Sequence, residues 1–182
     1  MWERLLDSLT LDMRRRKKSL LAFVPFIIAM VWVILLFISP LTQASGTIYL
    51  GNQGKVSLPD NAHNITVEVQ NPVARAVYLI GDIMCHQHAD RSFFIDGNQM
   101  PFCARCTGIF LGLAFGFLIG ALYDIRMGPL LYFIMIIPLG LDGTLQLITP
   151  YESTNFIRIV TGMLTGTFSA LVFAYIFSDY SS

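Results

Sequence analysis

The stretch Ser19–Leu41, SLLAFVPFIIAMVWVILLFISPL, runs for 23 residues without a charged side chain. An α-helix rises about 1.5 Å per residue, so about 20 apolar residues cross the hydrocarbon core of a bilayer. Further apolar stretches are Thr107–Tyr123, Pro129–Thr149 and Ile159–Ser178, and Asp142 is the single charge inside them. The sequence therefore predicts an all-α membrane protein with four transmembrane helices.

The composition excludes an ordinary water-soluble domain. Of the 182 residues, 54% are hydrophobic and only 13% are charged, whereas a soluble domain has about a quarter charged residues. Twelve basic residues balance twelve acidic ones, so the chain lacks the positive field that drives nucleic-acid binding. We expect no nucleic-acid partner. The expected partners are the lipid bilayer and either another membrane protein or a second copy of the chain.

The distribution of basic residues predicts the orientation in the membrane. Arg14, Arg15, Arg16, Lys17 and Lys18 directly precede the first apolar stretch, and such clusters stay on the cytoplasmic side. Four spans then place both termini in the cytoplasm of a multi-pass cell-membrane protein. The first stretch is longer than the apolar core of a secretory signal, about 7–15 residues, so an uncleaved signal anchor is expected.

These boundaries divide the chain into five predicted segments. The third should be a small extracytoplasmic β-ribbon, because Thr47–Leu50 and Lys55–Leu58 flank turn residues and Ile65, Val67 and Val69 alternate with polar residues. The fourth begins with the short apolar stretch Val73–Met84, which favours an interfacial helix over a span. The segments are 1–18 (basic cytoplasmic N-terminus), 19–41 (first transmembrane helix), 42–72 (β-ribbon), 73–102 (interfacial helix and Cys/His loop) and 103–182 (three-helix membrane core).

Small residues recur every four positions in two of the apolar stretches. Such stripes let helix backbones approach closely in a membrane, so we expect the two helices to be in contact. The stripes are Gly108, Gly112, Gly116 and Gly120 in one stretch and Gly162, Gly166, Ala170 and Ala174 in the other.

Cysteine and histidine residues gather in two short stretches, Cys85-His86-Gln87-His88 and Cys103-Ala104-Arg105-Cys106. Thiolate and imidazole together suit zinc or another transition metal, and a two-residue gap lets both cysteines of a pair face one ion. The metal-ligand candidates are therefore Cys85, His86, His88, Cys103 and Cys106, with His86 and His88 as alternatives for one position. The turn signal Asp96-Gly97-Asn98-Gln99 should fold the second stretch back over the first.

Two other interpretations of these cysteines stay open. A Cys-x-x-Cys pair at a helix N-terminus, beside Arg105, favours thiolate and is typical of a thiol–disulfide oxidoreductase using Cys103 and Cys106. Alternatively, a disulfide or a closed metal site would only pin the interfacial helix to the second span.

Polar residues within the apolar stretches are the remaining candidates. An acid inside a membrane is costly unless it is paired, so Asp142 marks either a functional site or an Asp142–Arg158 ion pair that sets helix register. Gln146 lies one helical turn after Asp142 and faces the same way. Arg105, Asp142, Gln146 and Arg158 are therefore candidates to line a cofactor site. A third alternative is a transport-related or accessory subunit in which Asp142 and Arg158 gate a pathway.

The motifs Cys85-His86-Gln87, Arg91-Ser92-Phe93-Phe94 and Cys103-Ala104-Arg105-Cys106-Thr107-Gly108 resemble the signature of a family of predicted bacterial and archaeal membrane proteins. The family is known as a domain of unknown function, number twenty eighty-five. Later residues resemble its second half: Pro138, Asp142-Gly143, Gln146, Asn155, Arg158, Thr161-Gly162 and Gly166. The resemblance implies the class of protein and no activity. His88 is outside the signature, so the resemblance favours His86 as the imidazole ligand.

Overall fold

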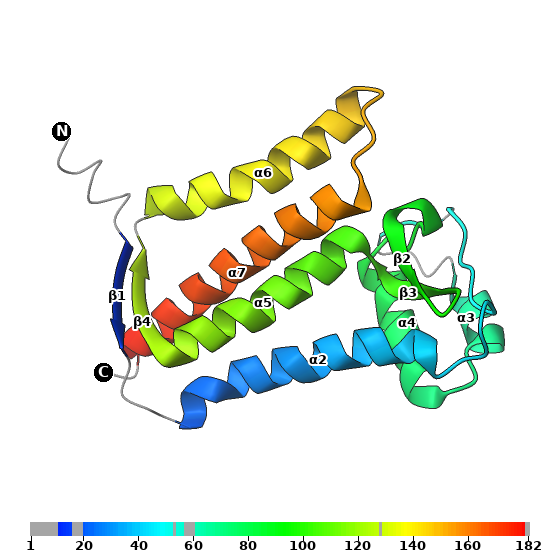
Figure 1. Cartoon of the computed structure of the whole chain (residues 1–182), viewed down its shortest axis with the longest axis horizontal. Helices are drawn as coiled ribbons and strands as arrows, with labels where there is room; N and C mark the ends of the chain where they lie inside the picture. The colour runs from blue at the N-terminus through cyan, green and yellow to red at the C-terminus, as the bar shows by residue number, and fades with distance from the viewer. Residues whose placement is uncertain (1–10, 16–19, 53, 57–60, 128, 181–182) are drawn as a thin grey trace.

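Four long helices lie side by side in the described part of the chain (Figure 1). The computed structural model describes residues 11–15, 20–52, 54–56, 61–127 and 129–180. A short 3-10 turn, η1 (Leu20–Phe23), leads into the first helix. Helix α5 packs between α2 and α7, and α6 packs on the other side of α7. The helices are α2 (Val24–Leu41), α5 (Ala104–Leu122), α6 (Pro129–Ile148) and α7 (Asn155–Tyr180).

Among the residues that the structure describes, three helices are long and apolar enough to cross a membrane. They cover Leu21–Leu41, Ala104–Leu122 and Asn155–Ile176. The apolar part of α6, among the residues that the structure describes, is shorter and covers Phe133–Gln146. The expected all-helical membrane core is thus confirmed for three spans, while a fourth span through α6 stays a prediction.

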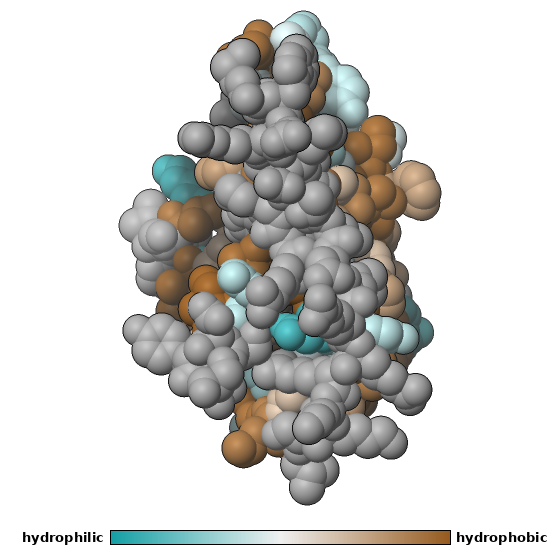
Figure 2. All heavy atoms as spheres, turned by 90° about the vertical axis from the view of Figure 1, so that its left-hand side faces the viewer, coloured by the Kyte–Doolittle hydropathy of each residue, from teal (hydrophilic) through white to brown (hydrophobic). Residues whose placement is uncertain are grey.

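The outer surfaces of the helices are apolar, as a lipid-facing bundle requires. On α2, Ile28 is 65% exposed, and on α6, Phe133 is 65% exposed. Figure 2 faces the end of the bundle that carries both termini, and it shows hydrophobic side chains along the flanks of the described part. In water such a surface would drive aggregation, whereas lipid tails solvate it.

The small-residue stripes of α5 and α7 form the tightest contact in the bundle, as the sequence predicts. A methyl group added at Gly112 would collide with the backbone of Met163, and one added at Gly166 would collide with the backbone of Ile109. Since both collisions involve backbone atoms, only glycine permits this approach of the two helices. The α5–α7 pair therefore forms the rigid centre on which the other elements rest.

A small folded layer caps one end of the bundle. It contains α3 (Ala62–Glu68), α4 (Pro72–Met84), η2 (Ala89–Arg91) and a hairpin of β2 (Ser92–Ile95) with β3 (Asn98–Cys103). At the opposite end, β1 (Leu11–Arg15) pairs antiparallel with β4 (Tyr123–Met127), close to both termini (Figure 1).

The expected β-ribbon over residues 42–72 is wrong in the described part of that segment. Ile65–Glu68 belongs to helix α3, and Thr47–Leu50 is irregular. Ile65 and Val69, four residues apart, are both fully buried, whereas Val67 is 59% exposed. That spacing is helical, so packing of one helical face overrides the β-propensity of the alternating residues. Residues 57–58 of the expected strand Lys55–Leu58 lie outside the described residues.

Candidate metal centre

Three cysteines from two separate stretches of the sequence converge under the cap. The sulfurs of Cys85, Cys103 and Cys106 all lie within 4.8 Å of one another, and each cysteine is a free thiol. Cys85 and Cys103 are buried and Cys106 is half-buried. Their surroundings are apolar, because Cys85 and Cys103 share a core cluster with Leu36 and Phe102. The predicted meeting of the two Cys-containing stretches is therefore present.

The β2–β3 hairpin brings the second stretch back to the first. Its turn residues Asp96 and Gly97 both have positive φ, at 51° and 74°, which matches the twist of a tight two-residue hairpin. A register shift between Ser92 and Phe94 then brings Ser92 opposite Cys103 across the two strands. Cys103 then caps the N-terminus of α5, and Cys106 lies in the first turn of that helix. The backbone N–H of Cys103 donates to the Cys85 sulfur at 3.4 Å.

A buried amide, Gln87, clamps the hairpin to α4. Its Nε2 donates to the carbonyl oxygens of Tyr78 and Pro101, both at 2.9 Å. Gln87 has φ 48° and is fully buried. A methyl group at Gly81 would collide with the Pro101 carbonyl and with the Gln87 amide, so α4 and β3 touch at this point. The clamp sets the distance between Cys85, at the end of α4, and Cys103, at the end of β3.

The cap contains further buried amides that sequence analysis did not single out. Asn98 Oδ1 accepts from the backbone N–H groups of Thr47 and Ile48, and Gln99 Oε1 accepts from that of Leu50. These bonds fasten the irregular segment after α2 to strand β3. The only sequence signal for these two amides was the predicted turn Asp96-Gly97-Asn98-Gln99. In the structure, Asn98 and Gln99 lie beyond the turn and begin the buried strand β3.

The sulfurs have unequal affinities for protons. The Cys103 sulfur accepts hydrogen bonds from the thiols of Cys106 and Cys85 and from His86, and these bonds hold its pKa well below the ordinary thiol value. Its position at the N-terminus of α5 acts in the same direction. By contrast, the hydrogen bond to Cys103 raises the pKa of Cys85 to about 12. The lowered pKa favours the thiolate form at Cys103, and the raised pKa favours the thiol form at Cys85.

The two candidate histidines have different surroundings. His86 lies close enough to Cys103 to help lower the pKa of that thiol, and its Nδ1 accepts the backbone N–H of His88 at 3.0 Å. His88 instead directs Nε2 to the carbonyl oxygen of Gly54, at 2.9 Å. Neither imidazole belongs to the group of described ligand atoms within 4.8 Å of one another, which contains only the three sulfurs. The structure therefore places His86 beside the cluster and His88 on a loop contact.

The expected Asp142–Arg158 ion pair is wrong, because Asp142 pairs with Arg105. Arg105 Nη2 donates to Asp142 Oδ2. Arg158 instead donates to Asn155 Oδ1 at 2.9 Å. Arg105, in the first turn of α5, reaches across to α6, whereas Arg158 is engaged by a residue one turn away on its own helix. The pair attaches α6 to the helix that carries Cys103 and Cys106.

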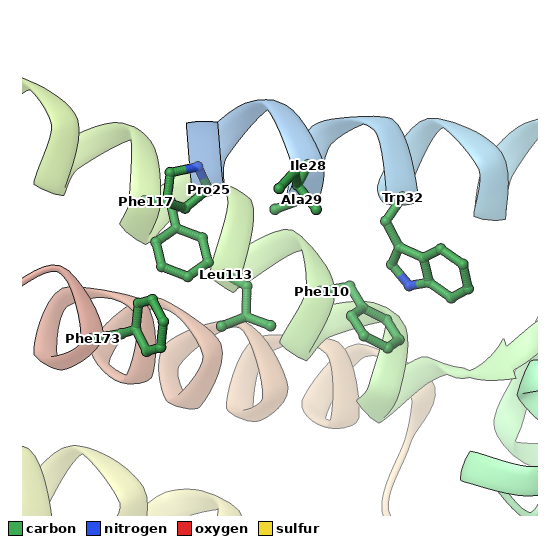
Figure 3. A pocket seen from close by; sticks show the side chains of 8 residues that line it. All are labelled: Pro25, Ile28, Ala29, Trp32, Phe110, Leu113, Phe117 and Phe173. Atoms are coloured by element: carbon green, nitrogen blue, oxygen red, sulfur yellow. The ribbon is translucent and has the colours of Figure 1, made fainter. Parts of the chain in front are cut away.

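An apolar pocket lies apart from the cysteine cluster. It measures about 390 Å³ and lies between α2, α5 and α7 (Figure 3). Trp32, Phe110 and Phe117 point into it, together with Phe173 of α7. Its lining contains no charged or metal-ligating side chain. It therefore has the character of a lipid-facing groove.

The fold and the site together define a helical membrane protein with a cluster of three thiols at one end of its bundle. Residues 85–172 match the family model described as "Predicted membrane protein (DUF2085)". An uncharacterized protein of the archaeon Methanothermobacter thermautotrophicus is 37% identical over 86 residues, which are 46% of this chain and 78% of that protein. The chain belongs to the DUF2085 family of predicted membrane proteins.

A second archaeal relative is similar over about half of the chain. An uncharacterized protein of Methanocaldococcus jannaschii is 39% identical over 99 residues, which are 52% of this chain and 64% of that protein. The chain thus spans less than two thirds of this relative. No solved structure matches.

Proposed function

We propose that this membrane protein binds a transition metal ion, best fitted by zinc, through Cys85, Cys103 and Cys106. The observation that carries the proposal is the convergence of all three sulfurs within 4.8 Å. Tetrahedral zinc with Zn–S bonds of about 2.3 Å separates two sulfurs by about 3.8 Å, so small side-chain movements complete the site. A disulfide would use two of the sulfurs and leave the third without a partner.

The fourth ligand is proposed to be His86. Its ring lies close enough to Cys103 to help lower the pKa of that thiol, whereas the His88 ring is engaged by the carbonyl oxygen of Gly54. A neutral imidazole that binds metal through Nε2 carries its proton on Nδ1, which now accepts the N–H of His88. Binding therefore costs one backbone hydrogen bond, and His86 contributes less to affinity than any cysteine.

Burial favours the metal site over the thiol–disulfide oxidoreductase. Cys103 has the lowered pKa that a nucleophilic thiol needs, and this is the observation that supports the redox alternative. However, Cys103 is only 3% exposed, which blocks a substrate disulfide from this sulfur, and its pair partner Cys106 is itself half-buried. Exchange reactions require access of the attacking thiolate to its target.

Positive charge near the N-terminus supports an extracytoplasmic location for the centre. The cap with the cysteines lies at the opposite end of the bundle from strand β1 (Leu11–Arg15), where the basic cluster begins (Figure 1). With basic residues retained in the cytoplasm, the proposed metal centre faces outward.

The test is metal analysis of protein purified in detergent, stripped with a chelator and reloaded with zinc or cobalt. We expect one ion per chain, with cobalt giving the absorption bands of thiolate ligation. Cys103→Ser should abolish binding and His86→Ala should weaken it, whereas His63→Ala, on the exposed surface of α3, should leave it unchanged. An ion retained at full affinity in Cys103→Ser would refute the ligand assignment. Two thiols lost to a disulfide in metal-free, unreduced protein would favour the redox alternative.

A further inference from the structure

A cavity of about 450 Å³ with a mixed lining, in which Leu139, Gly140 and Gly143 accompany four polar residues, lies next to the first turn of α5. Arg91 of η2 and Arg105 of α5 line it on one side, and Thr144 and Gln146 of α6 line it on the other. A cavity of a few hundred Å³ with a small number of converging polar groups is the usual form of a small-molecule site. The groups here are two guanidiniums, an amide and a hydroxyl, all able to donate hydrogen bonds.

The charges around this cavity leave a positive excess. Arg105 is paired with Asp142, and Arg91 Nε lies 3.5 Å from Asp90 Oδ2. The third arginine, Arg158, is 4% exposed and is bonded to a neutral amide oxygen. Since charge is costly in a bundle surrounded by lipid, a bound anion would stabilise this arrangement. The groups that act electrostatically on Arg158 are Arg91, Arg105, Asp90 and Asp142.

Hydrogen-bond donors are also left over in this region. Arg105 Nε, Gln146 Nε2 and Arg158 Nε are buried and have no hydrogen-bond partner among the residues described. Two oxygens, Asp142 Oδ1 and the hydroxyl of Thr107, are likewise buried without a hydrogen-bond partner among the described residues. Buried polar groups are normally satisfied, so three orphaned donors on cationic or amide groups point to a missing acceptor. A phosphate group offers several acceptor oxygens and forms bidentate bonds with guanidinium.

The depth of the cavity matches the level of lipid phosphates. Helix α5 has 19 residues and is therefore about 28 Å long, close to the thickness of about 30 Å of a hydrocarbon core. Arg105 is the second residue of that helix, which places its side chain at the boundary between the hydrocarbon and the headgroups. Basic pockets between membrane helices at this level bind anionic headgroups.

We propose that this cavity binds a phosphate group, carried either by an anionic phospholipid headgroup or by free phosphate. Arg91, Arg105 and Gln146 supply the donors, and Asp142 holds Arg105 in place by its bond to Nη2. The proposal is independent of the metal centre, since the cavity lining includes no cysteine or histidine.

The experiment measures binding by calorimetry on the full-length protein in a neutral detergent. The probes are inorganic phosphate and dihexanoyl phosphatidylglycerol, with dihexanoyl glycerol as the probe that lacks phosphate. The variants are Arg91→Gln and the double change Arg105→Gln/Asp142→Asn, which removes both charges of the buried pair together. Arg75→Gln on α4 removes one positive charge away from the cavity and is the matched control.

We expect the wild-type protein to bind at least one phosphate-bearing probe. Each cavity variant should weaken that binding about ten- to hundredfold, the effect of losing a charge-assisted hydrogen bond, whereas Arg75→Gln should not. Tighter binding of the phospholipid would identify a headgroup as the source, and binding of inorganic phosphate alone would identify a soluble one. The proposal is overturned if neither probe binds, if dihexanoyl glycerol binds equally well, or if Arg75→Gln weakens binding as much as the cavity variants. Zinc content serves as the parallel readout and should not change.

Discussion

The contact between α5 and α7 predicts a specific cost for adding one methyl group at Gly112. In Gly112→Ala the new Cβ would lie 2.8 Å from Thr167 N and 2.9 Å from the Met163 carbonyl carbon, where ordinary contacts measure 3.4–4 Å. Both atoms belong to the backbone of α7, so no side chain can rotate away. The Met163 carbonyl oxygen is closer still, so the two helices must separate by about 1 Å, and we place the cost at the upper end of overpacking, about 3 kcal/mol.

A matched control is present on α6. At Gly140 an added Cβ meets nothing within 4 Å, so Gly140→Ala only gains helix propensity, about 1 kcal/mol. Gly112→Ala gains the same propensity, and the difference between the variants isolates the overpacking. For a chain of this size about 1 kcal/mol corresponds to about 2–4 °C in Tm. Gly112→Ala should therefore melt about 6–12 °C below Gly140→Ala in scanning fluorimetry of purified protein. Equal melting temperatures would refute the close α5–α7 packing.

Three further predictions concern the cap and the cysteine cluster. Tyr78→Phe removes the buried hydroxyl that donates to the Gln99 carbonyl oxygen. It should lower the free energy of unfolding by about 1–3 kcal/mol, measured by denaturant titration. An unchanged free energy of unfolding would show that water replaces the hydroxyl. Asp142→Asn leaves the partly buried Arg105 without its counter-charge and should lower the free energy of unfolding by about 2–4 kcal/mol. The double variant Arg105→Gln/Asp142→Asn should recover part of that loss. A double variant less stable than Asp142→Asn would contradict the ion pair. Because the pKa of Cys103 is lowered, metal-free protein should show thiolate absorbance at neutral pH that Cys103→Ser lacks. The thiolate's contribution to the free energy of unfolding is fully present above the pKa of Cys103 in the unfolded chain. It is lost as the pH falls through the lowered pKa of Cys103 in the folded protein. Thiolate absorbance that appears only in alkali would contradict the assignment.

Properties that are local in the sequence predicted much of the architecture. Hydropathy and length located the spans that contain α2, α5 and α7, since a segment needs only its own residues to be apolar. The four-residue spacing of glycines likewise predicted the α5–α7 contact, because a stripe on one helix depends only on helical periodicity. The turn at Asp96 and Gly97 was readable for the same reason.

Tertiary packing decided the segments in which local preferences compete. Residues Ile65–Glu68 carry a strand-like alternation, yet they form α3 because Ile65 and Val69 both enter a buried cluster with Tyr78. The gain from burying one helical face exceeds a β-propensity difference of about 1 kcal/mol. A pattern of six residues cannot show which neighbours will cover it.

At the candidate site, the sequence by itself determined which residue types are present and which stretches carry them. The family resemblance already favoured His86 over His88, whereas the tertiary structure alone decided that Arg105 rather than Arg158 pairs with Asp142. The physical reason is that pairing depends on the rotation of each helix about its axis and on the path of the connecting hairpin. Those quantities are set by contacts between segments that are distant along the chain.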